Sequence, residues 1–325
     1  MNDGKVREVV VIGAGPAGYT AAIYLGRARF KPLLLTGSKA GGQLMLTTRV
    51  ENFPGFKEGI MGPDLMEEMR IQAEKFEAEI KMQEVTRVDL RSKVKKVWTG
   101  EKEYRARTVI VATGAEARML NKGEEKFLGK GVSTCAVCDA AFFKEKTVFV
   151  VGGGDTAMED ALALTRFVKS ATVIHRRNEL RASKIMQERV LGNNKIRILW
   201  DTEVVGVGGE SKLEKIKIRN VKDGKEEDLM AEGLFLAIGH APVSEFLKGQ
   251  VDLDEKGYLI TNLVKDGVDN KRVWLGGFPT QTSVEGVFGA GDVVDARYKQ
   301  AVTAAGMGCM AALDAGKFLT ESVVA

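Results

Sequence analysis

The sequence contains little cysteine and little histidine, with three cysteines and two histidines among its 325 residues. A small and odd number of cysteines argues against the disulfide framework of a secreted domain. Zinc needs about four soft ligands, and a second pair of such residues at ligand spacing is missing here. We therefore expect neither a disulfide-stabilised secreted fold nor a metal site.

The sequence also lacks any apolar run near the roughly 18 residues that a transmembrane helix needs. Its first residues lead into a strand pattern without the apolar core of a signal peptide. Neither sign of charge dominates, because 48 basic residues stand against 44 acidic ones, a formal net charge of +4. Such a balance does not indicate binding to nucleic acid or to a membrane. We therefore expect a cytoplasmic protein that binds neither.

Two of the three cysteines, Cys135 and Cys138, are separated by two residues. A pair at this spacing can close a small ring and reopen it, which is redox chemistry when a partner of suitable potential lies nearby. In a reducing compartment such a pair is more often catalytic or metal-binding than structural. Cys309 lies in an apolar stretch of small residues typical of a helix, where we expect a buried, inert thiol.

A glycine-rich turn, GAGPAG at residues 13–18, follows a β-branched run and precedes a helical pattern. In a dinucleotide-binding turn Gly13 would permit the tight bend, Gly15 would let the backbone approach a pyrophosphate, and Gly18 would let helix and strand pack closely. The helix N-terminus would add amides and a favourable dipole. The strand–turn–helix context favours a nucleotide site over a glycine turn without a ligand.

A second unit of the same kind follows the cysteine pair. The apolar run at 147–151 enters GGGDTA at residues 152–157, and a helical pattern continues to residue 168. The two cysteines therefore lie between two dinucleotide signatures. This order suggests an electron path from a nicotinamide through a flavin to a disulfide.

Basic residues end the next predicted strand, 171–174, and they are His175, Arg176, Arg177 and, close behind, Arg181. The nucleotide ribose lies at this position in a dinucleotide-binding fold, where an acidic residue favours a free 2′-hydroxyl and arginines accommodate a 2′-phosphate. The cluster therefore predicts NADPH rather than NADH. A solvated basic loop is the alternative.

Apolar runs that end in small residues recur on both sides of the second nucleotide unit, at 108–114, 234–240 and 286–292, and a helix is predicted at 300–319. This order indicates an α/β protein in which one nucleotide-binding domain is inserted into another. We expect the first domain to consist of residues 1–115 and 245–325, and the inserted domain, which carries the cysteine pair, to span 116–244.

Ten motifs occur along the chain in a set order, namely GAGPAG, TGSKAGGQL, VENFPG, ATG, CAVCD, GGGDTA, HRRNELRA, AIGH, TSVEGVFGAGDV and GCMAALDA. No single motif is specific, but the ordered set is. With it the chain resembles, over nearly its whole length, the low-molecular-weight, FAD-dependent thioredoxin reductases of bacteria, archaea and plants.

The resemblance implies two Rossmann-like domains, each a three-layer ββα structure, with an NADPH domain inserted into an FAD domain of two segments. It also implies a homodimer and electron flow from NADPH through FAD to the disulfide of thioredoxin. The expected enzyme is a thioredoxin-disulfide reductase that uses NADPH and acts in cell redox homeostasis.

The resemblance assigns roles to individual residues. Cys138 would face the flavin, Cys135 would exchange with thioredoxin, and Asp139 would donate and accept the proton. The residues expected to bind FAD are Gly13, Gly15, Pro16, Ala17, Thr36, Gly37, Gly42, Gln43, Leu44, Asn52, Ala112, Thr113, Gly114, Gly291, Asp292, Lys299, Gln300 and Ala301. The residues expected to bind NADPH are Gly154, Asp155, Thr156, His175, Arg176, Arg177, Arg181, Ile238 and Gly239.

The chain departs from the family pattern in a few places. Val137 stands where a threonine is usual between the cysteines, and Ala140–Ala141 replaces a common glycine. Lys299 stands where arginine is usual, which keeps the charge but loses the bidentate fork. The segment 265–280 is longer than in typical members, and we interpret it as a surface insertion. Thr36–Gly37 replaces the acidic ribose residue of the generic fingerprint, as it does in the family.

Three other functions are compatible with parts of the sequence. A related reductase or oxidase could use ferredoxin as the donor or a small-molecule disulfide as the acceptor, but the intact glycine turn and arginine cluster favour NADPH. A flavin- or nucleotide-binding sensor would not need the cysteine pair beside a complete NADPH site. A zinc module lacks ligands. We therefore predict the reductase.

Overall fold

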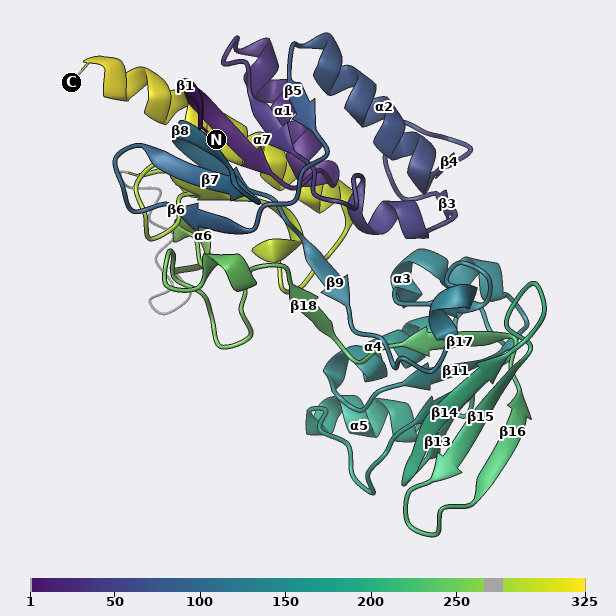
Figure 1. Cartoon of the computed structure of the whole chain (residues 1–325). Coiled ribbons are helices and arrows are strands. Elements are labelled where there is room, and N and C mark those ends of the chain that lie inside the picture. Colours follow the sequence, from purple (N-terminus) through teal and green to yellow (C-terminus); the bar gives the residue numbers. More distant parts are fainter. Residues whose placement is uncertain (1, 266–276, 325) are drawn as a thin grey trace. The chain divides into compact units, whose positions relative to one another are not determined.

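The computed structural model describes residues 2–265 and 277–324, so most of the predicted surface insertion at 265–280 lies outside the described residues. The chain forms two compact units (Figure 1). Unit 1 consists of Met1–Glu116 and Ala241–Ala325, and unit 2 of Ala117–His240. Each unit has its own sheets and its own hydrophobic cores.

Unit 1 is built around a sheet whose order is β5-β2-β1-β8-β7-β6, with β19 also paired to β8. The strands β5, β2, β1, β8 and β19 are parallel to one another, whereas β7 pairs antiparallel with both β8 and β6. The strands of unit 1 are β1 (Asn2–Ile12), β2 (Leu33–Leu35), β3 (Arg49–Val50), β4 (Ile60–Met61), β5 (Glu79–Lys81), β6 (Arg87–Asp89), β7 (Lys95–Thr99), β8 (Lys102–Val111) and β19 (Val287–Gly289). Its helices are α1 (Pro16–Arg27), η1 (Gly42–Leu46), α2 (Gly62–Lys75), η4 (Glu245–Leu247), α6 (Asn262–Lys265), η6 (Gly291–Val293) and α7 (Ala301–Val324).

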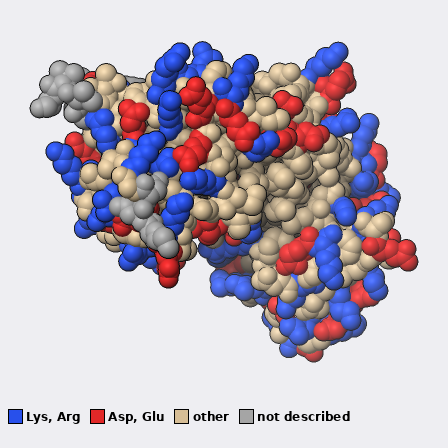
Figure 2. All heavy atoms as spheres, turned by 45° about the horizontal axis from the view of Figure 1, so that its top comes forward, with Lys and Arg blue, Asp and Glu red and all other residues tan. Residues whose placement is uncertain are grey.

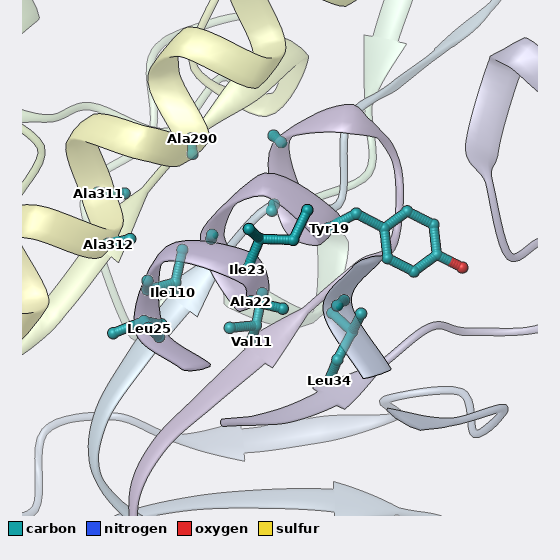
Figure 3. Close-up of a cluster of buried hydrophobic side chains, with 14 of the residues drawn as sticks. Val11, Tyr19, Ala22, Ile23, Leu25, Leu34, Ile110, Ala290, Ala311 and Ala312 are labelled. Atoms are coloured by element: carbon teal, nitrogen blue, oxygen red, sulfur yellow. The ribbon is translucent and has the colours of Figure 1, made fainter. Parts of the chain in front are cut away.

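Successive residues of β1 point to opposite faces of this sheet. Val9 and Val11 point to a core shared with α1, α2 and α7, whereas Val10 and Ile12 point to a core shared with β6, β7 and η4. Successive side chains of a strand face opposite sides, so an unbroken apolar run is the pattern of a strand buried on both faces. Figure 3 shows the helical side, where side chains of α1 lie beside Val11, Leu34 and alanines of α7.

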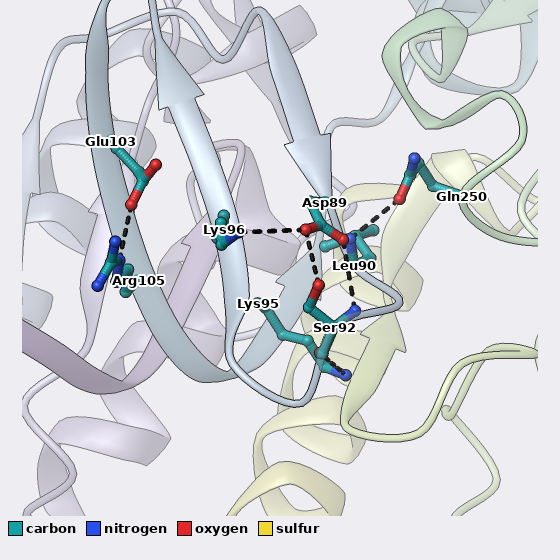
Figure 4. A network of polar contacts seen from close by, with 8 residues as sticks. All are labelled: Asp89, Leu90, Ser92, Lys95, Lys96, Glu103, Arg105 and Gln250. Atoms are coloured by element: carbon teal, nitrogen blue, oxygen red, sulfur yellow. Dashed lines mark hydrogen bonds and ion pairs between the residues drawn. The ribbon is translucent and has the colours of Figure 1, made fainter. Parts of the chain in front are cut away.

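A polar network joins the β6–β7 layer to the segment that returns after unit 2 (Figure 4). The Asp89 carboxylate accepts the Ser92 hydroxyl at 2.7 Å, and the buried Lys95 ammonium donates to the Ser92 carbonyl at 3.0 Å. The Leu90 N–H donates to the side-chain oxygen of Gln250 at 3.0 Å. Burial lowers the pKa of Lys95, although Glu285 and Asp89 oppose the shift. This network fixes two chain segments against each other across 160 residues of sequence.

Unit 2 has a parallel five-stranded sheet in the order β10-β17-β11-β12-β13. One face packs on the helices, with Val148 and Val150 in their core, and the other packs on the antiparallel sheet β14-β15-β16, with Phe149 and Val151 in that core. Its strands are β10 (Val132–Ser133), β11 (Thr147–Val151), β12 (Ser170–Ile174), β13 (Ile196–Leu199), β14 (Thr202–Gly208), β15 (Lys215–Asn220), β16 (Glu226–Met230) and β17 (Gly233–Leu236). Its helices are η2 (Glu124–Phe127), α3 (Ala136–Asp139), η3 (Ala140–Phe143), α4 (Asp155–Leu164) and α5 (Lys184–Leu191).

Both units therefore have the predicted α/β architecture, with a parallel sheet, helices on one face and an antiparallel layer on the other. The chain passes between the units at two strands, β9 (Ala115–Ala117) and β18 (His240–Pro242), and these two strands pair with each other (Figure 1). The sequence predicts that the chain crosses between the two units after residues 115 and 244. The pairing holds the two crossing segments side by side.

Charged side chains of both signs are interspersed on the face shown in Figure 2. Among the described residues, Arg219 pairs with Glu203 at 2.6 Å and Lys215 with Asp228 at 2.9 Å. Exposed pairs of this kind contribute little stability each. Among the described helices, none is both long and apolar enough to cross a bilayer.

The buried carboxylate of Glu124 leads to a stability prediction for unit 2. It is fully buried and accepts the backbone N–H groups of Leu120, Asn121 (3.0 Å) and Lys122 (2.7 Å). We expect Glu124→Ala to lower the free energy of unfolding by about 2–4 kcal/mol, because three backbone N–H groups lose the charged acceptor that they share. Urea unfolding measures the change. The matched control Glu125→Ala removes an exposed neighbour, and an equal loss in both variants would contradict the role of the buried hydrogen bonds.

Candidate functional site

The glycine turn of unit 1 lies at the carboxyl end of β1 and leads directly into α1. Gly13 adopts φ +101°, and its amide donates to the Leu35 carbonyl at 2.8 Å. A side chain at Gly18 would place its Cβ 1.8 Å from the Gly13 carbonyl oxygen, so this close approach of helix and turn requires glycine. The space beside Gly15 is open, and Pro16 begins α1. This is the local geometry of a dinucleotide-binding turn.

Strand register brings the other predicted segments of unit 1 to the same edge. Ile12 pairs with Leu35 of β2 and with Val111 of β8, and Val111 pairs with Gly289 of β19. The loops that follow these strands therefore lie side by side. They contain the predicted FAD residues Gly13, Gly15, Thr36, Gly37, Ala112, Thr113, Gly114, Gly291 and Asp292. Ligands of open α/β sheets bind at this edge.

Asp292 is the most informative residue at this edge. It lies in η6, and its Oδ1 atom is buried without a hydrogen-bond partner among the described residues. Burial raises the pKa of Asp292 to about 6, the nearby Asp295 carboxylate adds to the shift, and Lys299 opposes it. A buried acceptor without a partner is costly, so this carboxylate fits a ligand that donates hydroxyl hydrogen bonds. The ribityl chain of a flavin is such a ligand.

Two loops complete the surroundings of this edge. Gly42 begins η1, and a side chain there would have its Cβ 3.7 Å from the Gly15 Cα, which places Gly42 beside the glycine turn. The Asn52 amide donates to the Gln300 side-chain oxygen at 3.2 Å, joining the loop after β3 to the start of α7. Gln43 and Leu44 lie in η1, and Ala301 begins α7.

Lys299, the departure from the usual arginine, sits at φ +51°. The Asp295 carboxylate accepts its backbone N–H at 3.0 Å and those of Arg297 and Tyr298 at 2.8 Å each. Burial lowers the pKa of Lys299, while Asp295 and Asp292 oppose the shift. The loop thus places the Lys299 ammonium near the carboxylates of Asp292 and Asp295. A lysine cannot form the two parallel hydrogen bonds that an arginine would offer here.

Sequence reasoning missed Glu84, which lies near the turn after β2. Its Oε2 atom accepts the Ser38 backbone N–H at 2.9 Å and the Ser38 hydroxyl at 3.2 Å. An acidic side chain therefore lies beside the turn that follows the second strand, although Glu84 is 46 residues away from Ser38 in the sequence. A local pattern search cannot find such a residue.

Unit 2 repeats the edge geometry. Val151 pairs with Ile174 of β12 and with Leu236 of β17, so the loops that follow these three strands lie together. These loops and the first turn of α4 carry the predicted NADPH residues Gly154, Asp155, Thr156, His175, Arg176, Arg177, Arg181, Ile238 and Gly239.

The arginine loop is fixed against the glycine turn by hydrogen bonds. The Gly153 carbonyl accepts the backbone N–H groups of Arg181 at 2.7 Å and Ala182 at 3.1 Å. A side chain at Gly153 would place its Cβ 2.2 Å from the His175 ring, so the two segments are in close contact. His175 is buried and contacts the Glu179 carbonyl at 2.8 Å through Nε2. His175 therefore shapes the loop, whereas the exposed side chains of Arg176, Arg177 and Arg181 can reach a ligand.

A second hydrogen-bonded pair joins the two segments. The Asp155 carboxylate, at the first position of α4, accepts both the backbone N–H and the hydroxyl of Ser183 at 2.8 Å. These two bonds lower the pKa of Asp155. Asp155 thus supports the loop, and sequence reasoning, which made it a nucleotide contact, missed Ser183.

The cysteine pair forms a disulfide at the start of α3, with the two Cα atoms 5.3 Å apart. The Cys138 N–H points to the Cys135 sulfur at 3.3 Å, and Cys138 is exposed while Cys135 is half-buried. A disulfide in so short a ring beside solvent is suited to exchange with an external thiol or disulfide. Cys309 lies elsewhere, half-buried in α7 of unit 1.

Asp139 follows the disulfide directly, and its backbone N–H donates to the Cys135 carbonyl at 3.2 Å. Burial raises the pKa of Asp139, and a hydrogen bond with Ser133 opposes this shift. A carboxyl group that keeps its proton to higher pH is suited to proton transfer near a thiolate. Disulfide and acid therefore form one redox turn, residues 133–139.

The described part of the chain contains no group of three or more histidine, cysteine, aspartate or glutamate side chains arranged to hold a metal ion. The described residues offer instead two sheet edges with the geometry of dinucleotide turns, one in each unit, and the redox turn of unit 2.

Known proteins share this arrangement. Residues 7–308 match the family described as pyridine nucleotide-disulphide oxidoreductase. The chain is 51% identical to a thioredoxin reductase of Mycolicibacterium smegmatis over 97% of each chain, and 53% identical to a thioredoxin reductase of Streptomyces coelicolor over 97% of this chain and 94% of that protein. The solved thioredoxin reductase of Giardia duodenalis is 41% identical, with a TM-score of 0.87 over 97% of this chain and 100% of that one.

Matches of this identity over nearly the full length, together with the disulfide and the two nucleotide turns, leave one assignment. The chain is an oxidoreductase that belongs to the pyridine nucleotide-disulphide oxidoreductase family and, within it, to the thioredoxin reductases.

Proposed function

We propose that this protein transfers two electrons from NADPH to the disulfide of thioredoxin, consuming NADPH, a proton and the disulfide and releasing NADP⁺ and the dithiol. The observation that carries the proposal is the Cys135–Cys138 disulfide beside the half-buried Asp139, in the same unit as the arginine loop. The names of the relatives support the substrate.

FAD is the group that fits the edge of unit 1. The open space at Gly15 suits a pyrophosphate, and the buried, unpartnered Oδ1 of Asp292 suits the ribityl hydroxyls. When bound, FAD supplies two-electron transfer between a nicotinamide and a disulfide. The residues that would hold it are Gly13, Gly15, Pro16, Ala17, Thr36, Gly37, Gly42, Gln43, Leu44, Asn52, Ala112, Thr113, Gly114, Gly291, Asp292, Lys299, Gln300 and Ala301.

NADPH would bind at the edge of unit 2. The amides at the start of α4 would face its pyrophosphate, and Arg176, Arg177 and Arg181 would pair with its 2′-phosphate. Gly154, Thr156, Ile238 and Gly239 would line the remainder, and Asp155 and His175 would hold the loop in place.

Disulfide exchange then proceeds on the two cysteines. Two electrons and one proton open the Cys135–Cys138 bond to the Cys135 thiolate and the Cys138 thiol. The Cys135 thiolate attacks one sulfur of thioredoxin, forming a mixed disulfide and releasing a thioredoxin thiolate that takes a proton from Asp139. The Cys138 thiol gives its proton to the Asp139 carboxylate and, as a thiolate, attacks Cys135, which restores the internal disulfide and releases the second thioredoxin thiolate. This second thiolate takes the one proton that the reaction consumes from solvent.

An anaerobic titration of the purified, flavin-containing protein tests the proposal. We expect NADPH to bleach the flavin absorbance and NADH to do so poorly, with two more electrons taken up than the flavin alone accepts. Added thioredoxin should then reoxidise the protein. If neither nucleotide bleaches the flavin, the NADPH proposal fails, and a ferredoxin-linked reductase or a sensor takes its place. If NADPH works but only small disulfides reoxidise the protein, the acceptor assignment is wrong.

Asp292 predicts a pH dependence of flavin binding. With its pKa raised to about 6, the carboxylate is charged above that pH and protonated below it. The charged form is the stronger acceptor of ribityl hydrogen bonds, so the flavin should bind less tightly as pH falls through 6, by up to about tenfold per pH unit. Flavin fluorescence after dilution measures the release. Asp292→Asn should flatten this dependence, and an unchanged slope in that variant would exclude Asp292 as its source.

We also propose that the protein is a cytoplasmic homodimer, as the family resemblance implies. Light scattering of the purified protein tests the dimer, since a monomer and a dimer differ twofold in mass. The location is tested by fractionation of the source cells.

A further inference from the structure

We propose that Ser183 is a specificity-determining residue for NADPH, because its amide and its hydroxyl bond to Asp155 and thereby fix Arg181 where it can pair with a 2′-phosphate. The inference rests on the proposed function and deepens it. Ser183 acts as a positioning residue, through Arg181 rather than by touching the nucleotide. The inference concerns unit 2 alone.

Three consecutive residues of the arginine loop are bonded to the start of helix α4. The Gly153 carbonyl accepts the N–H groups of Arg181 at 2.7 Å and Ala182 at 3.1 Å. The Asp155 Oδ1 atom then accepts both the N–H and the hydroxyl of Ser183, each at 2.8 Å. The backbone of Arg181 is therefore held by one bond of its own and by the three bonds of the two residues that follow it.

Burial of its two neighbours leaves Arg181 facing outward. Leu180 and Ala182 belong to the helical core of unit 2, whereas Arg181 is exposed. The side-chain amide of Gln187 in α5 donates to the Ala182 carbonyl at 2.8 Å and holds the loop from the other side. The guanidinium of Arg181 therefore extends from a fixed stretch of backbone, at the edge of the sheet where the ribose of a dinucleotide is expected.

The Ser183 hydroxyl does not have the role that is usual for a serine at its position. Ser183 is the N-cap residue of α5, where a serine side chain commonly accepts an N–H group of the first helical turn. In α5, all of whose residues are described, its side chain makes no such bond. The hydroxyl donates to the Asp155 carboxylate instead, so it links α5 to α4 rather than capping its own helix.

The same two bonds hold the Asp155 carboxylate, which lies at the first position of α4. The pyrophosphate of a dinucleotide binds at such a helix start, and a carboxylate turned toward it would repel it. The amide and hydroxyl bonds from Ser183 lower the pKa of Asp155 and direct its charge toward the loop. Asp155 can therefore anchor the loop at the point where the nucleotide enters.

A fixed backbone matters because an arginine recognises a phosphate by geometry. Its guanidinium presents a planar fork of N–H groups, so the pairing needs a defined direction. A loop that is mobile in the free protein must be ordered when the ligand binds, and this ordering costs affinity. Loss of the Ser183 hydroxyl should therefore weaken ligands that carry a 2′-phosphate and leave ligands without one nearly unchanged.

Binding of 2′,5′-ADP and of 5′-AMP to the oxidised, flavin-containing protein tests the inference without turnover, because the two probes differ only in the 2′-phosphate. We expect calorimetry to show that Ser183→Ala weakens 2′,5′-ADP about tenfold and 5′-AMP less than about twofold. Ser183→Thr keeps the hydroxyl and should bind both probes within about twofold of the unmodified protein.

Two controls remove comparable groups elsewhere in unit 2. Asp223→Ala removes an exposed carboxylate that accepts the Lys225 N–H at 3.0 Å in the turn between β15 and β16. Ser211→Ala removes an exposed serine hydroxyl before β15. Both variants should leave the two affinities unchanged. An equal loss for both probes in Ser183→Ala, or no loss for either, would overturn the proposal.

Two double-mutant cycles test the route of the effect. In a protein that carries Asp155→Ala, Ser183→Ala should change the affinity for 2′,5′-ADP by less than about twofold, because the partner of the hydroxyl is already gone. The same small change is expected in a protein that carries Arg181→Ala, which lacks the group that Ser183 positions. Losses that multiply in either cycle contradict the proposed route.

Steady-state kinetics with thioredoxin as acceptor give a second readout. Ser183→Ala should raise KM for NADPH about tenfold and leave kcat and KM for NADH within about twofold, because only recognition of the 2′-phosphate is affected. A fall in kcat with unchanged KM would place Ser183 in the reaction itself and reject the positioning role.

The binding probes also separate this inference from the proposed function. If the unmodified protein binds both probes equally, the NADPH assignment and the role of Ser183 fail together. If it prefers 2′,5′-ADP and Ser183→Ala keeps that preference, only the role of Ser183 fails. If Ser183→Ala loses the preference in a protein that does not reduce thioredoxin, the role of Ser183 stands and the acceptor is rejected.

Discussion

Cys138→Ser should abolish NADPH-dependent reduction of thioredoxin, with a loss of kcat on the order of 1,000-fold or more, because both sulfurs are needed to re-form the internal disulfide. Cys135 alone can form a mixed disulfide but cannot release it. The structure makes the dependence direct, since the two residues are bonded to each other at the start of α3. The measurement is a coupled assay of NADPH oxidation with thioredoxin as acceptor.

The same variant should still be reduced by NADPH at the flavin, because the nucleotide edges do not include Cys138. The matched control is Cys309→Ser, which removes the half-buried third cysteine in α7 of unit 1. It should keep its activity within about twofold. Equal losses in the two variants would mean that the disulfide of the redox turn is not the working one.

The arginine loop predicts the second large effect. In the double variant Arg176→Ala and Arg177→Ala, KM for NADPH should rise on the order of 100-fold, because two charge-assisted hydrogen bonds of about 1.5 kcal/mol each are lost. KM for NADH should change by less than about twofold, since NADH has no 2′-phosphate. Steady-state kinetics with each nucleotide measure this change in preference.

Arg189→Ala is the control for this pair, because it removes an exposed arginine of α5 in the same unit. It should leave both KM values unchanged. If NADH and NADPH suffer equally in the double variant, the arginines support the fold of the loop and do not read the phosphate. If neither suffers, the loop is merely a solvated basic segment.

The sequence predicted the fold class because its signals are local. Unbroken apolar runs that end in glycine, such as those before Gly13 and Gly152, identify strands buried on both faces and the turns that follow them. The predicted helix at 300–319 is α7, Ala301–Val324. Only its boundaries differ from the prediction, as expected where helix ends depend on capping and packing.

The contacts that sequence reasoning missed are those between distant segments. Glu84 meets Ser38 across 46 residues, and Asp155 meets Ser183 across 28. No spacing rule connects such partners, because the sheet brings them together. The resemblance implies a second β layer in unit 2, but the sequence pattern did not locate its strands β14, β15 and β16, which lack an unbroken apolar run like that of β11. The assigned ligand roles of the site residues remain predictions.

Likewise, burial changed the interpretation of single residues. The ring of His175, which is predicted to contact NADPH, is buried in the loop and contacts the Glu179 carbonyl, so the structure adds a role in shaping the loop while the NADPH contact stays a prediction. Ser133 had no role in the sequence reading, because a buried hydroxyl that accepts the backbone N–H of Cys135 cannot be distinguished in sequence from any other serine in a strand. Only coordinates show which polar atoms share a partner.

The pairing of β9 with β18 allows unit 2 to be exchanged as one module in evolution. Segment 117–240 enters and leaves through adjacent strands, so its two ends meet at one place. A segment with neighbouring ends can be exchanged as a cassette without rerouting the sheet that receives it. Because the redox turn and the arginine loop both lie in this cassette, one recombination event could change the electron donor and the protein acceptor together, while the host sheet of unit 1 stays the same.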